Sequence, residues 1–303
     1  YYFSGGSKHM SNASNTHINL ESGRLNVQIA HPGSIYNGSR FDWTAFITKI
    51  VLDNKYSFCV PESEIPGQGS GGFGLCNEFG ITTPIGYDEA KPKEKFPKLG
   101  TGLLTRPDES DYFFFDKYEV DPFPVKISKD SNSVVFEVEP VDCNGYAVKM
   151  TKTVSLKDNV LTIDYRLENV GIKHIKTEEY CHNFFSVNNN RIGDGFVLKF
   201  PYDISPKEIP EVMNIKDNEI RWNFVPKGDF YCQIEGFKSV KQHYWELIYE
   251  PERVGIKEYS DFEIAKVAVW GTTHVVSPEV FINVDIAPGK TQEWRRQYEF
   301  FTF

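Results

Sequence analysis

A histidine in aromatic surroundings is the first feature of this sequence that could carry chemistry. His182 lies within Glu-Glu-Tyr-Cys-His-Asn-Phe-Phe, residues 178–185. Aromatic side chains stack on the faces of sugar rings, while histidine and asparagine bond to hydroxyl groups. The alternative is a core histidine that only satisfies a backbone carbonyl. We therefore treat His182 and the adjacent Asn183 as candidates for a sugar site.

A glutamate far downstream is the second candidate. Glu279 follows Pro278 where a strand is expected to begin, and Trp270 lies shortly before it. A carboxylate at the mouth of a strand can act as a base at the edge of a groove, with Trp270 as an aromatic wall. The alternative is an exposed charge at a strand end.

Two further groups could reach the same groove. Arg40, in Gly-Ser-Arg-Phe-Asp, could hold hydroxyls or a carboxylate with its planar guanidinium, or form a surface ion pair with Asp42. His243 has Tyr244 and Trp245 beside it and could line a groove or pack in the core.

A glycine-rich segment over residues 72–80 reads Gly-Phe-Gly-Leu-Cys-Asn-Glu-Phe-Gly. No Gly-Lys-Ser follows it and no helix is expected after it, so it is not a phosphate-binding loop. Glu78 or Asn77 could contact a ligand, and Lys98 and Arg106 beyond the segment could do likewise.

Composition excludes several classes of protein. The net charge is −9, with 33 Lys and Arg against 42 Asp and Glu, which disfavours a nucleic-acid or anionic-membrane partner. No apolar run approaches the roughly 18 residues of a membrane span. The five cysteines are widely spaced without a C-x-x-C pair, so we expect reduced thiols and a cytoplasmic location. No histidine and carboxylate pair has metal-ligand spacing, and we expect neither a metal nor another cofactor.

The elements that must position these groups are strands. Residues 134–141 alternate, with Phe136 and Val138 against Glu137 and Glu139. The next run alternates through residues 146–156 with Lys152 as the one break, and residues 161–168 resume the pattern after an Asp-Asn turn. Residues 280–286 and 293–303 are expected strands near the C-terminus. Such period-2 runs predict an all-β protein, a large antiparallel β-sandwich.

Several segments lack the strand pattern, and they indicate where loops and domain boundaries lie. Residues 61–98 are rich in Gly and Pro and are expected to form a long, functional loop. Residues 205–214 have no helical periodicity. Residues 1–10 look like a linker remnant, and residues 11–303 are expected to form one domain, with 11–23 as an N-terminal arm or first strand. The oligomeric state stays open.

These segments together resemble the aldose 1-epimerase (galactose mutarotase-like) superfamily. Residues 161–171, Leu-x-Ile-x-Tyr-x-Leu-x-Asn-x-Gly, match the family's lead-in strand and turn, and residues 180–187 match its central motif. The resemblance implies that His182 is the catalytic histidine, although Cys181 stands where the family has Asn. It also implies that Glu279, with Ala-Pro-Gly behind it, is the catalytic glutamate. Residues 72–106 depart from ordinary galactose mutarotases.

The resemblance implies a sugar-binding supersandwich and acid/base chemistry at an anomeric centre. Glu279 would be the base and His182, as imidazolium, the acid. The groove contacts would be Arg40, Glu78, Arg106, Asn183, His243 and Trp270, around a mono- or oligosaccharide. Two alternatives remain: a lyase or other glycoside-processing enzyme on the same fold, and a non-catalytic carbohydrate-binding protein.

Overall fold

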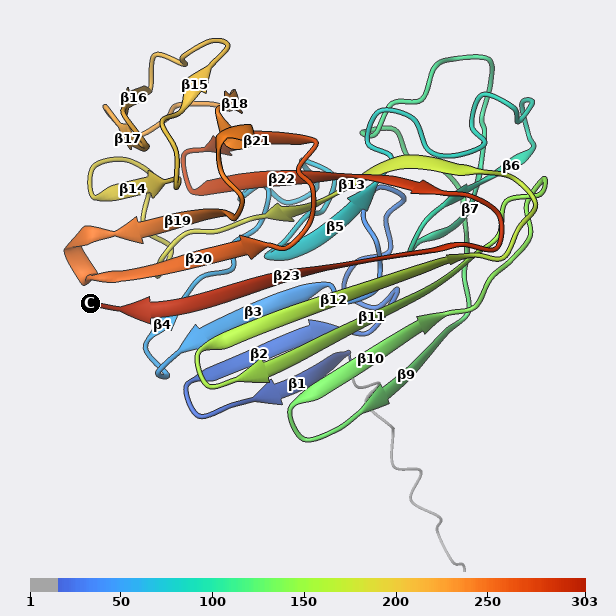
Figure 1. The fold of residues 1–303 in the computed structure, drawn as a ribbon, viewed down its shortest axis with the longest axis horizontal. Helices are drawn as coiled ribbons and strands as arrows, with labels where there is room; N and C mark the ends of the chain where they lie inside the picture. The colour runs from blue at the N-terminus through green and yellow to red at the C-terminus, as the bar shows by residue number, and fades with distance from the viewer. Residues whose placement is uncertain (1–15) are drawn as a thin grey trace, which may run out of the picture.

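The computed structural model describes residues 16–303, and its regular structure is almost entirely antiparallel β-sheet (Figure 1). In the described chain the helical segments are two short 3-10 turns, Phe237–Ser239 and Glu250–Glu252. The strands form two ten-stranded sheets and one small sheet of three strands. The predicted all-β sandwich class is confirmed.

The first large sheet carries the candidate residues at its centre. Its order is β1-β2-β3-β5-β13-β22-β21-β18-β15, with β4 paired to β3. Its strands are β1 (His17–Glu21), β2 (Leu25–Ala30), β3 (Ile47–Leu52), β4 (Tyr56–Ser57), β5 (Leu75–Phe79), β13 (Ile175–Asn183), β15 (Ser205–Pro206), β18 (Phe230–Glu235), β21 (Lys266–Thr272) and β22 (Val275–Ile286).

The second large sheet contains the long hairpin that the alternating pattern predicts. Its order is β16-β17-β14-β19-β20-β23-β12-β11-β10-β9. Its strands are β9 (Val125–Lys129), β10 (Ser133–Val138), β11 (Val148–Lys157), β12 (Val160–Asn169), β14 (Phe196–Lys199), β16 (Met213–Lys216), β17 (Glu219–Trp222), β19 (His243–Tyr249), β20 (Val254–Ser260) and β23 (Thr291–Thr302). The small sheet comprises β6 (Lys95–Lys98), β7 (Gly102–Thr105) and β8 (Val120–Pro122).

The core lies between the two large sheets. One cluster of buried apolar side chains joins Leu75 and Cys181 of the first sheet to Val154 and Leu161 of the second. Each strand of the hairpin β11–β12 alternates buried and less buried positions, so one face of the second sheet packs inward. The strands predicted at 134–141, 146–156, 161–168, 280–286 and 293–303 correspond to β10, β11, β12, part of β22 and β23.

Lys152, which breaks the apolar alternation of β11, nevertheless points inward. Its side chain is completely buried, and its Nζ donates to Asp42 Oδ2 at 3.0 Å, to Asn77 Oδ1 at 2.6 Å and to the Thr44 carbonyl at 3.0 Å. The period of two is therefore unbroken, because a buried cation with three oxygen partners occupies an inward position.

The expected long loop over residues 61–98 contains two strands, β5 and β6, which corrects that prediction. β5 lies between β3 and β13 in the first sheet, and all five of its residues are buried. A strand buried on both faces shows no alternation. Gly74 and Gly80, both at positive φ, bound it and give it the composition of a loop.

Two predictions concern the N-terminal part of the chain, a first strand within residues 11–23 and a linker remnant at residues 1–10. β1 supplies a first strand within residues 11–23, whereas the linker remnant at residues 1–10 lies outside the described part of the chain. Among residues 16–303, no helix is long and apolar enough to cross a membrane. Residues 205–214 form no helix, as expected.

Candidate functional site

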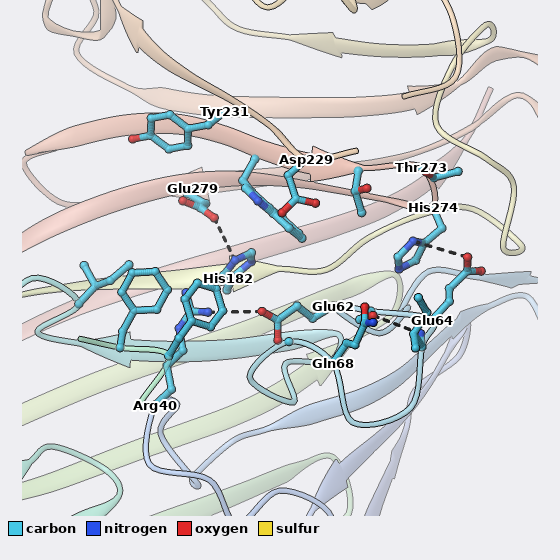
Figure 2. A pocket seen from close by; sticks show the side chains of 18 of the residues that line it. Arg40, Glu62, Glu64, Gln68, His182, Asp229, Tyr231, Thr273, His274 and Glu279 are labelled. Carbon is cyan, nitrogen blue, oxygen red and sulfur yellow. Dashed lines mark hydrogen bonds and ion pairs between the residues drawn. The ribbon is translucent and has the colours of Figure 1, made fainter. Parts of the chain in front are cut away.

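The pairing of β13 with β22 brings the two principal candidates together. Tyr180 is opposite Phe281 in this antiparallel ladder, so His182 and Glu279, two residues further along each strand, reach the same place on the same face. The His182 Nε2 and Glu279 Oε1 atoms are 3.3 Å apart, and both side chains are largely buried (Figure 2). Glu279 thus lies within β22, not at the mouth of a strand as expected.

Ser277, two residues before Glu279 on β22, connects the pair. Its Oγ lies 2.8 Å from His182 Nδ1, accepts the Asn183 backbone N–H at 2.9 Å and donates to Glu279 Oε1 at 3.3 Å. Ser277 has one hydroxyl proton, and Glu279 receives it. The arrangement that satisfies all three contacts therefore protonates His182 on Nδ1 and leaves Nε2 as an acceptor facing Glu279.

Burial sets the protonation of the pair. It raises the pKa of Glu279 to about 8, although Arg40, Lys266 and the Ser277 hydrogen bond pull that pKa down. Burial and the nearby Arg40 cation hold the pKa of His182 well below its usual 6.5. At neutral pH the unliganded site therefore holds a protonated Glu279 and a neutral His182. These protonation states are the reverse of the carboxylate and imidazolium that the resemblance implies, because two charges would be expensive to bury here.

Aromatic rings fix the imidazole of His182. Phe184 stacks on it with ring centroids 3.8 Å apart and planes 10° apart. Trp270 and Phe41 present their rings nearly at right angles, with centroids 5.3 and 6.0 Å away. These contacts leave His182 little rotational freedom and place the indole of Trp270 beside the pair, as its predicted role as a groove wall requires.

Arg40 reaches the site through a dense set of hydrogen bonds. It donates from Nε to Glu78 Oε2 at 2.9 Å, from Nη2 to the Tyr180 hydroxyl at 3.1 Å and from Nη1 to Ser70 Oγ at 2.8 Å. Nη1 also lies 3.5 Å from Glu62 Oε1. These contacts use four of the five guanidinium N–H groups and leave one on Nη2 without a partner among the described residues. Arg40 does not pair with Asp42.

Glu78 supports Arg40 instead of contacting the cavity. Its side chain is fully buried and accepts from Arg40 and from the Tyr180 hydroxyl. Lys98 Nζ lies 3.5 Å from the other oxygen of Glu78, and burial lowers the pKa of Lys98 to about 8. Glu78 therefore positions the Arg40 guanidinium, and its side chain does not make the ligand contact that was predicted.

A cavity of about 720 Å³ opens in front of these groups. Arg40, Tyr180, His182, Trp270 and Glu279 line it. The lining also includes residues for which we made no prediction: Glu62, Gln68, Phe114, Phe115, Asp229, Tyr231 and His274. The run of three phenylalanines at 113–115 could have predicted the aromatic side chains that line the cavity. Tyr231 becomes recognisable only from the ladder, where it is opposite Trp270.

Besides Glu78, three further predicted contacts lie away from the cavity. Arg106 donates to the backbone carbonyls of Tyr87, Ala90 and Asp108, at 2.8 to 3.2 Å, and so ties a loop to the small sheet. His243, on β19 of the second sheet, bonds to Tyr202 at 3.0 Å, and burial lowers its pKa to about 3.

Asn183 is the third of these predicted contacts, and it points into the core. Its Nδ2 donates to the Pro278 carbonyl at 2.6 Å, and its Oδ1 accepts from the Tyr298 hydroxyl at 3.0 Å. Neighbouring residues of a strand face opposite sides of the sheet, so the side chains of His182 and Asn183 cannot share the cavity. Within residues 16–303, no cluster of three His, Cys, Asp or Glu side chains has the geometry to hold a metal ion.

The fold is that of the galactose mutarotase-like proteins. The chain resembles Slr1438 from Synechocystis sp. PCC 6803, with a TM-score of 0.61 and 12% identity over 97% of this chain and 100% of that one. It also resembles a galactose mutarotase related enzyme from Lactobacillus acidophilus, with a TM-score of 0.61 and 10% identity over 94% and 97%. A third similar structure is a galactose mutarotase-like protein from Lactobacillus casei ATCC 334. Its TM-score is 0.58, with 13% identity over 94% of this chain and 100% of that one. No family model and no curated protein matches the sequence. At these identities the likeness defines the fold alone.

Proposed function

We propose that this protein is a carbohydrate-active isomerase of the aldose 1-epimerase type, which interconverts the anomers of an aldose. The observation that carries the proposal is the pair of His182 and Glu279. Their side chains lie 3.3 Å apart at the wall of a cavity, with one group protonated and the other an acceptor at neutral pH. Anomer interconversion needs a proton acceptor at the anomeric hydroxyl and a proton donor at the ring oxygen, and both oxygens are bonded to the same carbon.

The chemistry can be written with this pair alone. Nε2 of His182 accepts the proton of the anomeric hydroxyl, and the electron pair of that O–H bond becomes the second C1–O1 bond. The C1–O5 bond breaks, and O5 takes the proton of Glu279. After rotation about C1–C2 the hydroxyl O5 attacks the other face of the aldehyde, returns its proton to Glu279, and O1 recovers its proton from His182. One proton on the pair is sufficient for the whole cycle.

The surrounding residues suit a sugar. Trp270 and Tyr231 offer aromatic faces, and the free N–H of Arg40 can donate to a ring hydroxyl. Ser277 holds His182 in the tautomer whose Nε2 can accept a proton. Tyr180, with its hydroxyl bonded to both Arg40 and Glu78, fixes the position of the guanidinium.

The proposal is tested by following the anomer ratio of freshly dissolved α-glucose, α-galactose and other aldoses by NMR, with and without the protein. We expect equilibration faster than in buffer for at least one aldose. No acceleration for any free aldose or reducing oligosaccharide would contradict the proposal. Binding of a sugar without acceleration would instead favour a carbohydrate-binding protein.

A further inference from the structure

The cavity extends well beyond the catalytic pair. His182, Glu279 and Arg40 lie toward one end, whereas Glu64 and His274 lie toward the other, with Gln68, Asp229 and Thr273 along the way (Figure 2). We call Glu64, Gln68, Asp229, Thr273 and His274 the distal arm. A water occupies about 30 Å³ of liquid, so 720 Å³ corresponds to roughly 24 waters. A single hexose, with about a dozen non-hydrogen atoms, fills less than half of this space.

The wall of the distal arm on the β21–β22 side is tied to neighbouring loops. The His274 Nε2 atom lies 2.8 Å from the Pro61 carbonyl, and Thr273 Oγ1 donates to the Pro226 carbonyl at 2.8 Å. Glu64, which belongs to the loop between β4 and β5, accepts from Arg191 at 2.6 Å. The arm is therefore present before a ligand binds, as is usual for small-molecule sites.

The opposite wall is the loop between β4 and β5, and Glu62 fixes its shape. The Glu62 carboxylate accepts the backbone N–H groups of Ser70 at 2.7 Å and Gly72 at 3.1 Å. The loop thus closes on itself and presents Gln68 to the cavity.

Two polar side chains of the distal arm are free to bind a ligand. Gln68 and Asp229 are exposed, line the cavity, and bond through their side chains to no other residue within 16–303. An amide and a carboxylate can together donate to and accept from sugar hydroxyls.

We propose that the preferred substrate is a reducing disaccharide or longer oligosaccharide. Its reducing-end ring lies at His182 and Glu279, and its next ring occupies the distal arm against Gln68 and Asp229. This inference rests on the proposed anomer interconversion for the placement of the reducing end. It adds a second sugar subsite, which a free monosaccharide would leave empty.

The experiment compares glucose with lactose, maltose, cellobiose and melibiose, which all carry glucose at the reducing end. Anomer equilibration is followed by NMR for the wild type, for Gln68→Trp, which fills the arm, and for Gln242→Trp. Gln242 is an exposed glutamine away from this cavity and is the matched control. We expect kcat/KM for at least one disaccharide to exceed that for glucose by roughly ten-fold or more. That ratio should fall to about one in Gln68→Trp and stay unchanged in Gln242→Trp, with all three proteins folded by thermal melting.

The outcomes separate this inference from the proposed function. Acceleration of glucose with no disaccharide preferred over it overturns the distal subsite and leaves anomer interconversion intact. The subsite is also overturned if the preference survives in Gln68→Trp. If no sugar is accelerated, saturation-transfer NMR measures binding directly. Tighter binding of a disaccharide than of glucose, lost in Gln68→Trp, then supports the subsite, and equal binding overturns it.

Discussion

Nδ1 of His182 and Oγ of Ser277 lie 2.8 Å apart, on neighbouring strands β13 and β22. The same serine hydroxyl donates to Glu279 and accepts the backbone N–H of Asn183. One small side chain therefore fixes the tautomer of the histidine and orients the carboxyl group. In the described chain, no other residue contacts both His182 and Glu279 through a hydrogen bond.

Replacing Ser277 by alanine should therefore impair catalysis without removing either reacting group. The His182 Nδ1–H loses its acceptor, and we expect kcat to fall roughly 10- to 100-fold, as for other residues that orient a catalytic side chain. Since the Ser277 hydrogen bond lowers the pKa of Glu279, its loss should also move the alkaline limb of the pH–rate profile to higher pH. A fall in kcat with no change in that limb would indicate a purely structural role.

The pH dependence of kcat/KM follows from the two protonation states. Activity should fall as pH rises through about 8, because Glu279 then loses the proton it donates. On the acid side activity should persist below pH 6.5, because the pKa of His182 lies well below that value. Polarimetry across pH 4 to 10 measures both limbs. Activity that rises steadily above pH 8 would be incompatible with a protonated Glu279.

The buried carboxyl of Glu279 should also cost stability. Its folded pKa is about 8 and its unfolded pKa about 4.5, so the folded state binds the extra proton between these values and stability falls as pH rises from 4.5 to 8. Glu279→Gln removes this loss. As pH rises from 4.5 to 8, we expect the free energy of unfolding of the variant to increase relative to that of the wild type. The increase should reach up to a few kcal/mol, at about 1.4 kcal/mol per pKa unit.

Chemical denaturation at pH 5 and pH 8 measures this difference in the free energy of unfolding. Asp285→Asn is the matched control, because Asp285 is an exposed carboxylate on the same strand, β22. A Glu279→Gln variant that is no more stable than the wild type at pH 8, relative to pH 5, would show that Glu279 is not held protonated.

Local periodicity was sufficient to predict the long strands of the second sheet. β10, β11 and β12 alternate because one face of each is buried, and the Asp-Asn turn separates the last two. β5 could not be found in this way, since a short strand buried on both faces and flanked by glycines carries no period of two.

The sequence surroundings of His182 and Glu279 made both residues candidates, and the resemblance to a known family supplied the roles expected of them. Their 3.3 Å contact depends on a pairing between strands that are far apart in the chain. Arg106 and His243 had suitable chemistry, yet the fold satisfies them with backbone carbonyls and with Tyr202. Nothing local in the sequence distinguishes such a residue from one that faces a ligand.

The buried ion pair of Lys152 gives a test of the core. Lys152→Met keeps the aliphatic stem but leaves Asp42 and Asn77 without their cation, and we expect a loss of about 3–5 kcal/mol in the free energy of unfolding. Lys157→Met, at an exposed position of the same strand, should change it by less than about 0.5 kcal/mol. Urea unfolding measures both. Equal effects of the two substitutions would show that the buried contacts of Lys152 contribute nothing to stability.

The most direct test of the proposed function is the rate of anomer exchange in His182→Gln, Glu279→Gln and the double variant, measured by NMR on an aldose that the wild type accelerates. His174→Gln and Asp285→Asn are the controls, because both residues are exposed and outside the cavity. We predict that each single variant loses roughly 10²- to 10⁴-fold in rate and that the double variant loses little more than the worse single one, since the two groups act as a unit. Rates within about three-fold of the wild type in either folded single variant would contradict the account.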